Sequence, residues 1–335
     1  MPVDGARVDR VAAFKALLHP AAPRLAVTAR RAEALGLGGT EPVLINLDAT
    51  DDAETIFALA ADADVERKVT GTPAGPAAAA AIALAKLAQQ LPALLVAPAD
   101  ALPEIPFDPP LLTVAAKAVA KFRQEIIRSL AIAGEAQVPI ANGVDTRFVV
   151  FRDAIGGSPV AIIVGEPDFS APVPVRVHSA CLTGDVFGSR RCDCGDQLHL
   201  AVNCLKEAGG GVILYLQQEG RGLGLANKMR AYALQDLGLD TVDANTTLGF
   251  EDDERDYGAA ARMLEILGCS RVVMLTNNPD KLDGLAGAGI EISRRLPLNT
   301  PIHAHNRRYL SALALRAGHL LDGVLDGEVN DKNRA

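Results

Sequence analysis

The stretch Gly211-Val-Ile-Leu-Tyr-Leu216 is followed by Gln217-Gln-Glu-Gly-Arg-Gly-Leu-Gly-Leu-Ala-Asn-Lys228. The first six residues predict a buried strand, and a helix is expected over 225–237, ending at Gly238. Between them, alternating glycines allow close backbone approach, and the helix start offers free N–H groups to an anion. Because the segment also contains the basic residues Arg221 and Lys228, it predicts a phosphate-binding loop, although a structural turn can have a similar glycine content. It is not a Walker loop, because no Gly-Lys-Ser/Thr ends it.

Strand and helix patterns alternate on both sides of this segment. Strands are predicted at 148–152, 160–164, 173–178, 271–276 and 291–293, and helices at 198–208, 255–267 and 280–286. This alternation predicts an α/β fold, in which helices flank a mixed sheet and loops at the strand ends bind ligands.

Residues 1 to about 130 differ in character, being rich in Ala, Leu and Pro and lacking Cys. Helices are predicted at 8–18, 77–91 and 114–133, strands at 42–47 and 93–97, and a further helix capped by Asp51 or Asp52. The four prolines within 101–110 indicate a linker or loop. We therefore predict a smaller α+β domain at 1–130, a catalytic domain at 131–325 and a disordered tail at 326–335.

Composition argues against several classes of protein. The net charge of −8 disfavours a general nucleic-acid binder. Residues 176–230, however, contain seven Lys or Arg and five Asp or Glu, and this local excess of positive charge suits a small anionic ligand. The chain has no run of eighteen apolar residues and no secretory signal pattern, so no membrane contact is expected. Five cysteines, an odd number, favour a reducing cytoplasm over a disulfide scaffold.

Three of the five cysteines, Cys181, Cys192 and Cys194, lie within fourteen residues. Three thiolates can hold a zinc ion and leave its fourth tetrahedral position to water, as in catalytic sites. Burial of the three thiols without a metal is disfavoured, because Cys-Asp-Cys-Gly is a polar turn. His178 is open to three interpretations: a fourth ligand, a group that orders water or phosphate, or a strand-end histidine satisfied locally.

Two further segments and one tyrosine carry polar groups suited to a nucleotide. In Glu251-Asp-Asp-Glu-Arg-Asp-Tyr257, Asp252 or Asp253 is a natural N-cap, whereas Arg255 in the first turn would oppose the helix dipole and indicates an anionic ligand. In Leu275-Thr-Asn-Asn-Pro-Asp-Lys281, a buried strand runs into hydrogen-bonding side chains. Tyr232 lies four residues beyond Lys228 on one helix face, where burial in the core is equally expected.

Together these segments closely resemble GTP cyclohydrolase II, the zinc enzyme that opens riboflavin biosynthesis, from about 134 to about 322. The resemblance is carried by Arg176-Val-His-Ser179, Cys181-Leu-Thr-Gly-Asp185, Arg191-Cys-Asp-Cys-Gly195, Gln218-Glu-Gly-Arg221, Asn227-Lys-Met-Arg-Ala-Tyr-Ala-Leu-Gln-Asp236, Asp253-Glu-Arg-Asp256 and Leu275-Thr-Asn-Asn-Pro279. These motifs occur in the family's order, so the match is highly specific.

The resemblance implies a role for each matched residue. One zinc per subunit would be bound by Cys181, Cys192 and Cys194, with Asp253 as proton acceptor, Arg255 as nucleophile and Tyr232 in catalysis. GTP would contact Arg176, Val177, His178, Ser179, Ala180, Gln197, Glu219, Gly220, Arg221, Thr241, Thr276 and Lys281. The implied products are 2,5-diamino-6-hydroxy-4-(5-phosphoribosylamino)pyrimidine, formate and diphosphate, with Mg²⁺ on the triphosphate and a homodimeric enzyme. A protonated guanidinium is a poor nucleophile, so Arg255 could instead stabilise charge on the α-phosphate.

Two positions depart from the family pattern. Ala180 stands where the family often has Glu, and Gln217 replaces a common arginine. The N-terminal region has the place of a 3,4-dihydroxy-2-butanone-4-phosphate synthase domain but lacks its acidic signature, and it resembles the degenerate extension of some cyclohydrolases. Two alternatives to an active cyclohydrolase remain: a non-turnover GTP- and zinc-binding homologue, or a related ring-opening enzyme of pyrimidine catabolism.

Overall fold

The computed structural model describes residues 1–102, 110–141, 143–316 and 318–321. Contacts divide the chain into two compact units: a first unit of Met1–Arg123 with Gly222–Glu254, and a second unit of Gln124–Arg221 with Arg255–Ala335. The domain boundaries at 130 and 325 stay predictions, and the predicted tail lies outside the described residues, as does most of the proline-rich linker.

The first unit contains a four-stranded antiparallel sheet in the order β3-β2-β1-β4. The strands are β1 Arg24–Val27, β2 Val43–Asn46, β3 Gly71–Pro73 and β4 Ala93–Val96, and the helices of this region are α1 Val8–Leu18, α2 Ala29–Ala34, α3 Ala53–Ala61 and α4 Pro76–Leu87, with a short 3₁₀ turn η1 at Ala99–Ala101. Asp52 caps α3 by accepting a hydrogen bond from the Thr55 N–H at 2.9 Å. The predicted α+β class of this smaller domain is confirmed.

A segment from the later part of the chain belongs to the same unit. It carries α7 Leu225–Asp236 and α8 Thr241–Thr247, and α8 packs against α2. Helix α7 was predicted almost to the residue, whereas α8 was not predicted. Seven residues are too few for a stable isolated helix, so packing within the unit stabilises α8.

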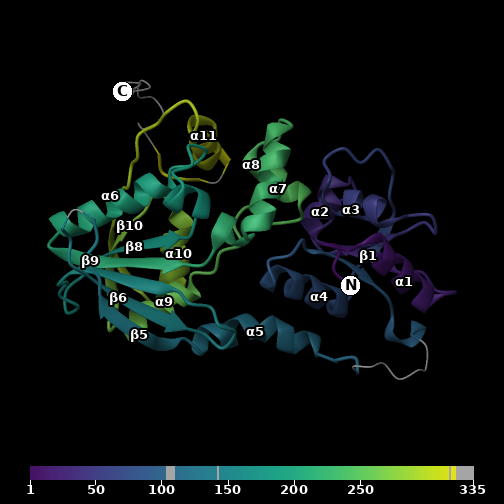
Figure 1. Cartoon of the computed structure of the whole chain (residues 1–335), viewed down its shortest axis with the longest axis horizontal. Helices are drawn as coiled ribbons and strands as arrows, with labels where there is room; N and C mark the ends of the chain where they lie inside the picture. The colour runs from purple at the N-terminus through teal and green to yellow at the C-terminus, as the bar shows by residue number, and fades with distance from the viewer. Residues whose placement is uncertain (103–109, 142, 317, 322–335) are drawn as a thin grey trace. The chain divides into compact units, whose positions relative to one another are not determined.

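The second unit is built on a seven-stranded mixed sheet in the order β11-β10-β8-β9-β7-β6-β5 (Figure 1). Strands β11, β10, β8 and β9 run parallel to one another. Strand β7 pairs with β9 in the antiparallel sense, as do β6 with β7 and β5 with β6. The strands are β5 Ala131–Gln137, β6 Thr146–Arg152, β7 Val160–Gly165, β8 Val173–Ser179, β9 Gly210–Leu216, β10 Arg271–Leu275 and β11 Glu291–Leu296. The predicted mixed α/β sheet is therefore confirmed.

Helices cover both faces of this sheet. They are α6 Cys194–Glu207, α9 Gly258–Ile266 and α10 Pro279–Gly287. Helix α11 Arg307–Arg316 packs in a separate apolar cluster, and α5 Ala116–Arg128 crosses the division between the units. Val212 and Leu214 of β9 join the core formed with α9, whereas Ile213 joins the core formed with α6. Since side chains alternate along a strand, Arg176 and His178 of β8 face α6, opposite to Val175 and Val177.

Several predicted boundaries were wrong; α6, for example, begins at Cys194, four residues before its predicted start. The helix predicted over 114–133 ends at Arg128, and Ala131–Gln137 forms β5 because its backbone pairs with β6. The helix predicted from 255 begins at Gly258, so neither Asp252 nor Asp253 is its N-cap, and Arg255 is not in its first turn. Helix α4 ends at Leu87, four residues before the predicted end.

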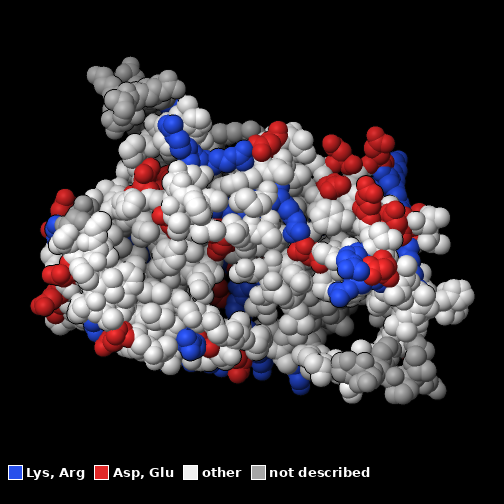
Figure 2. Space-filling view, viewed as in Figure 1, with Lys and Arg blue, Asp and Glu red and all other residues white. Residues whose placement is uncertain are grey.

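The described helices include none that is both long and apolar enough to cross a membrane. On the face shown in Figure 2, acidic and basic side chains lie interspersed over the surface.

Candidate metal centre and surrounding site

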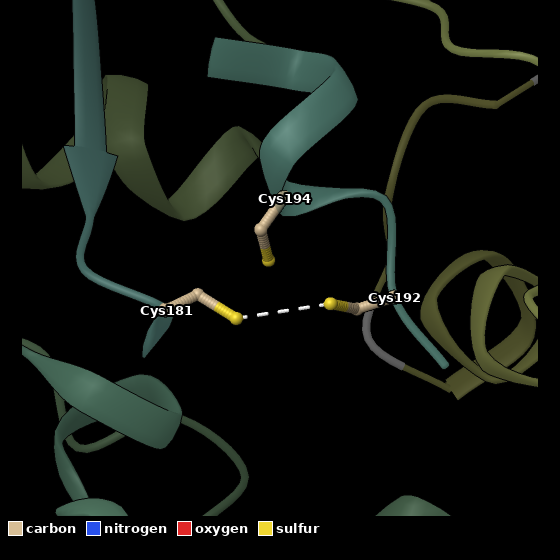
Figure 3. A group of neighbouring side chains, drawn as sticks. All are labelled: Cys181, Cys192 and Cys194. Atoms are coloured by element: carbon tan, nitrogen blue, oxygen red, sulfur yellow. Dashed lines mark hydrogen bonds between the residues drawn. The ribbon is translucent and has the colours of Figure 1, made fainter. Parts of the chain in front are cut away.

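Three thiols converge in the second unit. Cys181 lies just beyond β8, Cys192 lies before α6, and Cys194 is the first residue of α6; their side chains point toward one another (Figure 3). The three sulfur atoms lie within 4.8 Å of one another, and the Cys181 and Cys192 sulfurs are 3.7 Å apart. Two sulfurs bound to a tetrahedral zinc at about 2.3 Å would be about 3.8 Å apart. The spacing therefore fits a metal ion held by three thiolates.

Each of these thiols perturbs its neighbours. A hydrogen bond with Cys181 is the main cause that raises the pKa of Cys192, to about 11. Hydrogen bonds from Cys181 and Cys192, together with burial, raise the pKa of Cys194. Crowded buried thiols resist ionisation, and a divalent cation supplies the charge that lets them ionise together. Over the part of the chain that the structure describes, this is the only group of three His, Cys, Asp or Glu side chains close enough to hold a metal.

Glycines make room for the thiols. A Cβ at Gly184 would lie 3.0 Å from the Cys192 sulfur and 3.1 Å from the Cys181 sulfur. A Cβ at Gly195 would lie 2.5 Å from the Gly184 carbonyl oxygen. The one-turn π-helix η2, Leu182–Val186, therefore packs so closely against the start of α6 that a side chain at Gly195 would meet backbone and one at Gly184 would displace the sulfurs.

A buried carboxylate organises the backbone beside the first thiol. Asp185 accepts hydrogen bonds from the Cys181 N–H and the Tyr215 hydroxyl, each at 2.9 Å. Its other oxygen lies 3.1 Å from Nε2 of His178, whose ring stacks on Tyr215 at 5.6 Å. Burial lowers the pKa of His178, so the neutral ring donates from Nε2 to the acceptor-only carboxylate. The structure thus places His178 with Asp185 and outside the thiol group.

Arg176 crosses from β8 to its neighbours on the α6 face. Its guanidinium, 5 % exposed, donates to the Leu275 carbonyl at 3.1 Å and to Gln197 of α6. Gln197 donates in turn to Asp193 at 2.6 Å, and Asp193 also accepts from the Thr300 hydroxyl at 2.9 Å. Burial lowers the pKa of Arg176 to about 10, so it keeps its positive charge at neutral pH. A buried cation in this position can attract an anionic ligand.

The glycine-rich loop lies against the thiol loop. After β9, the chain turns through η3, Glu219–Gly222, and Glu219 accepts a hydrogen bond from the Leu182 N–H at 2.7 Å. Arg221 has φ of 60°, in the left-handed region that residues with a side chain seldom adopt. Such strain commonly marks a functional position. Helix α7 follows with Gly224 as its N-cap, so the predicted order of strand, loop and helix is confirmed.

Polar residues also gather at the end of β10. Thr276 is 1 % exposed, and its hydroxyl accepts a hydrogen bond from the Asn278 N–H at 3.0 Å. Lys281, 5 % exposed, donates to the Val177 carbonyl of β8 at 2.8 Å. Through these contacts the end of β10 and the start of α10 are tied to the strand that leads to Cys181.

The two departures from the family pattern have modest local roles. The Ala180 N–H donates to the Leu216 carbonyl at 2.8 Å, which continues the pairing of β8 with β9. The side chain of Gln217 accepts a hydrogen bond from the Ser158 N–H at 2.9 Å. Both side chains are thus compatible with an undistorted sheet.

The predicted site residues divide between the two units. The thiols, Arg255 and the residues predicted to contact GTP lie in the second unit, except Thr241, which lies in the first unit with Tyr232 and Asp253. Within the first unit, the Lys228 ammonium is 5.7 Å from the centre of the Tyr232 ring, so the predicted shared helix face is confirmed. Arg255 lies 5.7 Å from the ring of Tyr257.

Sequence reasoning missed several residues that support the thiols and their neighbours: Asp185, Asp193, Tyr215 and Thr300. Asp185 ends the Cys-Leu-Thr-Gly-Asp motif and could have been singled out as a buried acceptor. Thr300 is 107 residues from Asp193 along the chain, and no local pattern could have predicted that contact.

The fold and the thiol group define an α/β protein with a candidate metal centre. The family model for GTP cyclohydrolase II matches residues 131–297. A GTP cyclohydrolase-2 from Azospirillum brasilense is 45 % identical over 317 residues, covering 90 % of this chain and 82 % of the relative. The chain therefore belongs to the GTP cyclohydrolase II family, a family of enzymes.

Two other relatives match less of this chain. A GTP cyclohydrolase-2 from Azotobacter vinelandii is 48 % identical over 60 % of this chain and 97 % of its own length. The riboflavin biosynthesis protein RibBA from Bacillus subtilis is 54 % identical over 50 % of this chain and 42 % of its own length. The relatives named GTP cyclohydrolase-2 therefore differ in whether they match most of this chain or only part of it.

Proposed function

We propose that this protein is a zinc-dependent GTP cyclohydrolase II. It would convert GTP to 2,5-diamino-6-hydroxy-4-(5-phosphoribosylamino)pyrimidine, formate and diphosphate, the first step of riboflavin biosynthesis. The observation that carries the proposal is the convergence of Cys181, Cys192 and Cys194 in a chain of this family.

The three thiolates would hold the zinc ion, and the remaining position would stay open to water. When bound, zinc supplies the Lewis acidity that makes water nucleophilic near neutral pH. Gly184 leaves space for the sulfurs, and the Asp185 carboxylate fixes the backbone N–H of Cys181. The chain itself therefore orients the ligands before the metal arrives, which favours affinity.

Cations and backbone donors would bind the nucleotide. Arg176 and Arg221 bring positive charge from the middle of β8 and from the glycine-rich loop, and Mg²⁺ would share the charge of the triphosphate. We propose the following residues as GTP contacts: Arg176, Val177, His178, Ser179, Ala180, Gln197, Glu219, Gly220, Arg221, Thr241, Thr276 and Lys281.

Three further residues would act on the reacting groups. Asp253 would accept a proton, and Tyr232 would serve as a catalytic hydroxyl. Arg255 would act on the α-phosphate, either as a nucleophile or by stabilising its developing charge. The second role agrees better with a guanidinium that stays protonated below a pH of about 12.

The test is a turnover assay on purified protein with GTP, Zn²⁺ and Mg²⁺, following formate and diphosphate. We expect both products from the wild type and no formate from Cys192→Ser. Cys204→Ser is the matched control, because Cys204 lies on α6 outside the thiol group. Absence of both products from zinc-loaded wild-type protein would refute the proposal, and GTP binding without turnover would identify a non-catalytic homologue.

The same preparation tests the zinc content and the oligomeric state. We propose one zinc per subunit and a homodimeric, cytoplasmic enzyme. Metal analysis gives the zinc content, and light scattering gives the mass of the particle. A monomer that turns over GTP at the full rate would contradict the dimer.

A further inference from the structure

The N-terminal region, residues 1–123, is bound closely to the segment 222–254 within the first unit. This segment contains α7 and α8 and carries Tyr232 and Asp253. An apolar cluster joins the two parts: Leu91 of the N-terminal region packs with Leu248 and Phe250, all at most 1 % exposed. Burial of this kind holds the segment against the region as a single body.

A buried arginine joins three helices of the unit. Arg31 of α2 is 2 % exposed and donates to the carbonyls of Ala58 at 2.7 Å and Leu59 at 2.8 Å, in the last turn of α3. It also donates to the carbonyl of Thr247, the last residue of α8, at 2.8 Å. Carbonyls at helix ends lack intrahelical partners and carry the negative end of the dipole, so a cation there stabilises both helices.

Ion pairs connect both ends of the segment to the N-terminal region. Arg230 of α7 pairs with Asp4 through two hydrogen bonds, at 2.6 and 3.1 Å. Glu254, the neighbour of Asp253, lies 2.5 Å from the Lys86 ammonium. These side chains are between 13 % and 28 % exposed, which limits screening by solvent.

Two backbone contacts complete the attachment. The Thr28 hydroxyl donates to the Gly249 carbonyl at 2.7 Å, and Asn227 of α7 donates to the Gln89 carbonyl at 3.1 Å. Gly249 has φ of 81°, and a Cβ there would lie 2.9 Å from the Thr28 oxygen. The close approach of these two segments of the chain therefore requires glycine at this position.

We propose that the N-terminal region acts as a positioning element for the reaction, with Asp4, Arg31 and Lys86 as positioning residues. It orders α7 and α8 and thereby fixes Tyr232 and Asp253. The inference rests on the proposed function, since it assumes that these two residues serve catalysis. A displacement of about 1 Å in a catalytic group can cost about 100-fold in rate.

The test compares full-length zinc-loaded variants. Asp4→Asn and Lys86→Gln each remove one contact to the segment. Arg67→Gln is the matched control, because the Arg67–Asp51 ion pair, at 2.6 Å with side chains 30 % and 6 % exposed, lies wholly inside the N-terminal region. The readouts are hydrogen exchange of peptides over 225–250, the zinc content, and kcat and KM for formate release.

We expect Asp4→Asn and Lys86→Gln to speed exchange over 225–250 about 10-fold and to lower kcat about 10-fold. Zinc content stays unchanged, and Arg67→Gln stays within about two-fold of wild type in both readouts. Unchanged exchange in the two contact variants overturns the inference, as does faster exchange with unchanged kcat. An equal loss of kcat in Arg67→Gln would mean general destabilisation and also overturns it.

Failure of the proposed function is recognised separately. If the zinc-loaded wild type releases no formate, the proposed function fails and the positioning role fails with it. The exchange data still decide whether the contacts order α7 and α8. A charge exchange, Asp4→Arg with Arg230→Asp, should restore slow exchange if the pair itself is responsible.

Discussion

Gly184→Ala tests the geometry of the thiol group with one methyl group. The new Cβ would lie 3.0 Å from the Cys192 sulfur and 3.1 Å from the Cys181 sulfur, whereas ordinary contact begins at 3.4 Å. The sulfurs would have to move by about 0.4 Å, twice the tolerance of about 0.2 Å for metal–ligand distances. Gly184 does not have a left-handed backbone, so alanine adds no backbone strain there.

We expect Gly184→Ala to weaken zinc binding about 10- to 100-fold, which corresponds to about 1.4–2.8 kcal/mol. Competition with a chromophoric chelator measures the affinity, and formate release should fall in parallel at limiting zinc. Gly287→Ala is the control, since nothing lies within 4 Å of its Cβ position and its backbone is also not left-handed. If Gly184→Ala binds zinc within two-fold of wild type, the thiols do not hold the metal in the geometry described.

Three further predictions concern other buried groups. Lys281→Met leaves the Val177 carbonyl without its donor and should lower the free energy of unfolding by about 1–3 kcal/mol in urea titrations; a change below about 0.5 kcal/mol would contradict this role. Burial lowers the pKa of His178 below 6.5, so the unfolded state binds a proton at this residue more readily than the folded state does. As the pH falls below 6.5, the free energy of unfolding of the metal-free wild type should therefore fall more than that of His178→Gln. Equal losses in the two proteins would contradict this. Burial raises the pKa of Cys269 to about 11, so at pH 8 only about one Cys269 thiol in a thousand is ionised. Iodoacetamide should therefore not label Cys269 in the native protein. Labelling as fast as in urea would contradict this protection.

Local patterns predicted most of the elements. Helix α1 and the strands β7, β8 and β9 were predicted within one residue, because each is a short apolar or amphipathic run bounded by turn residues. Ala131–Ala133 misled, since alanine favours a helix while pairing with β6 places these residues in β5. The acidic run before Gly258 also misled: Asp252 or Asp253 was predicted to cap the helix, but its N-cap is Tyr257.

The spacing of Cys181, Cys192 and Cys194 by itself indicated a metal centre and, with the ordered motifs, the GTP cyclohydrolase II family. This was possible because ligands close in sequence need only one strand end and one helix start to meet. The tertiary structure alone decided what surrounds them: Asp185 between Cys181 and Tyr215, Thr300 on Asp193, and the attachment of 222–254 to the N-terminal region. The contacts of Tyr215, of Thr300 and of the N-terminal region join residues far apart in the sequence, which no local pattern encodes.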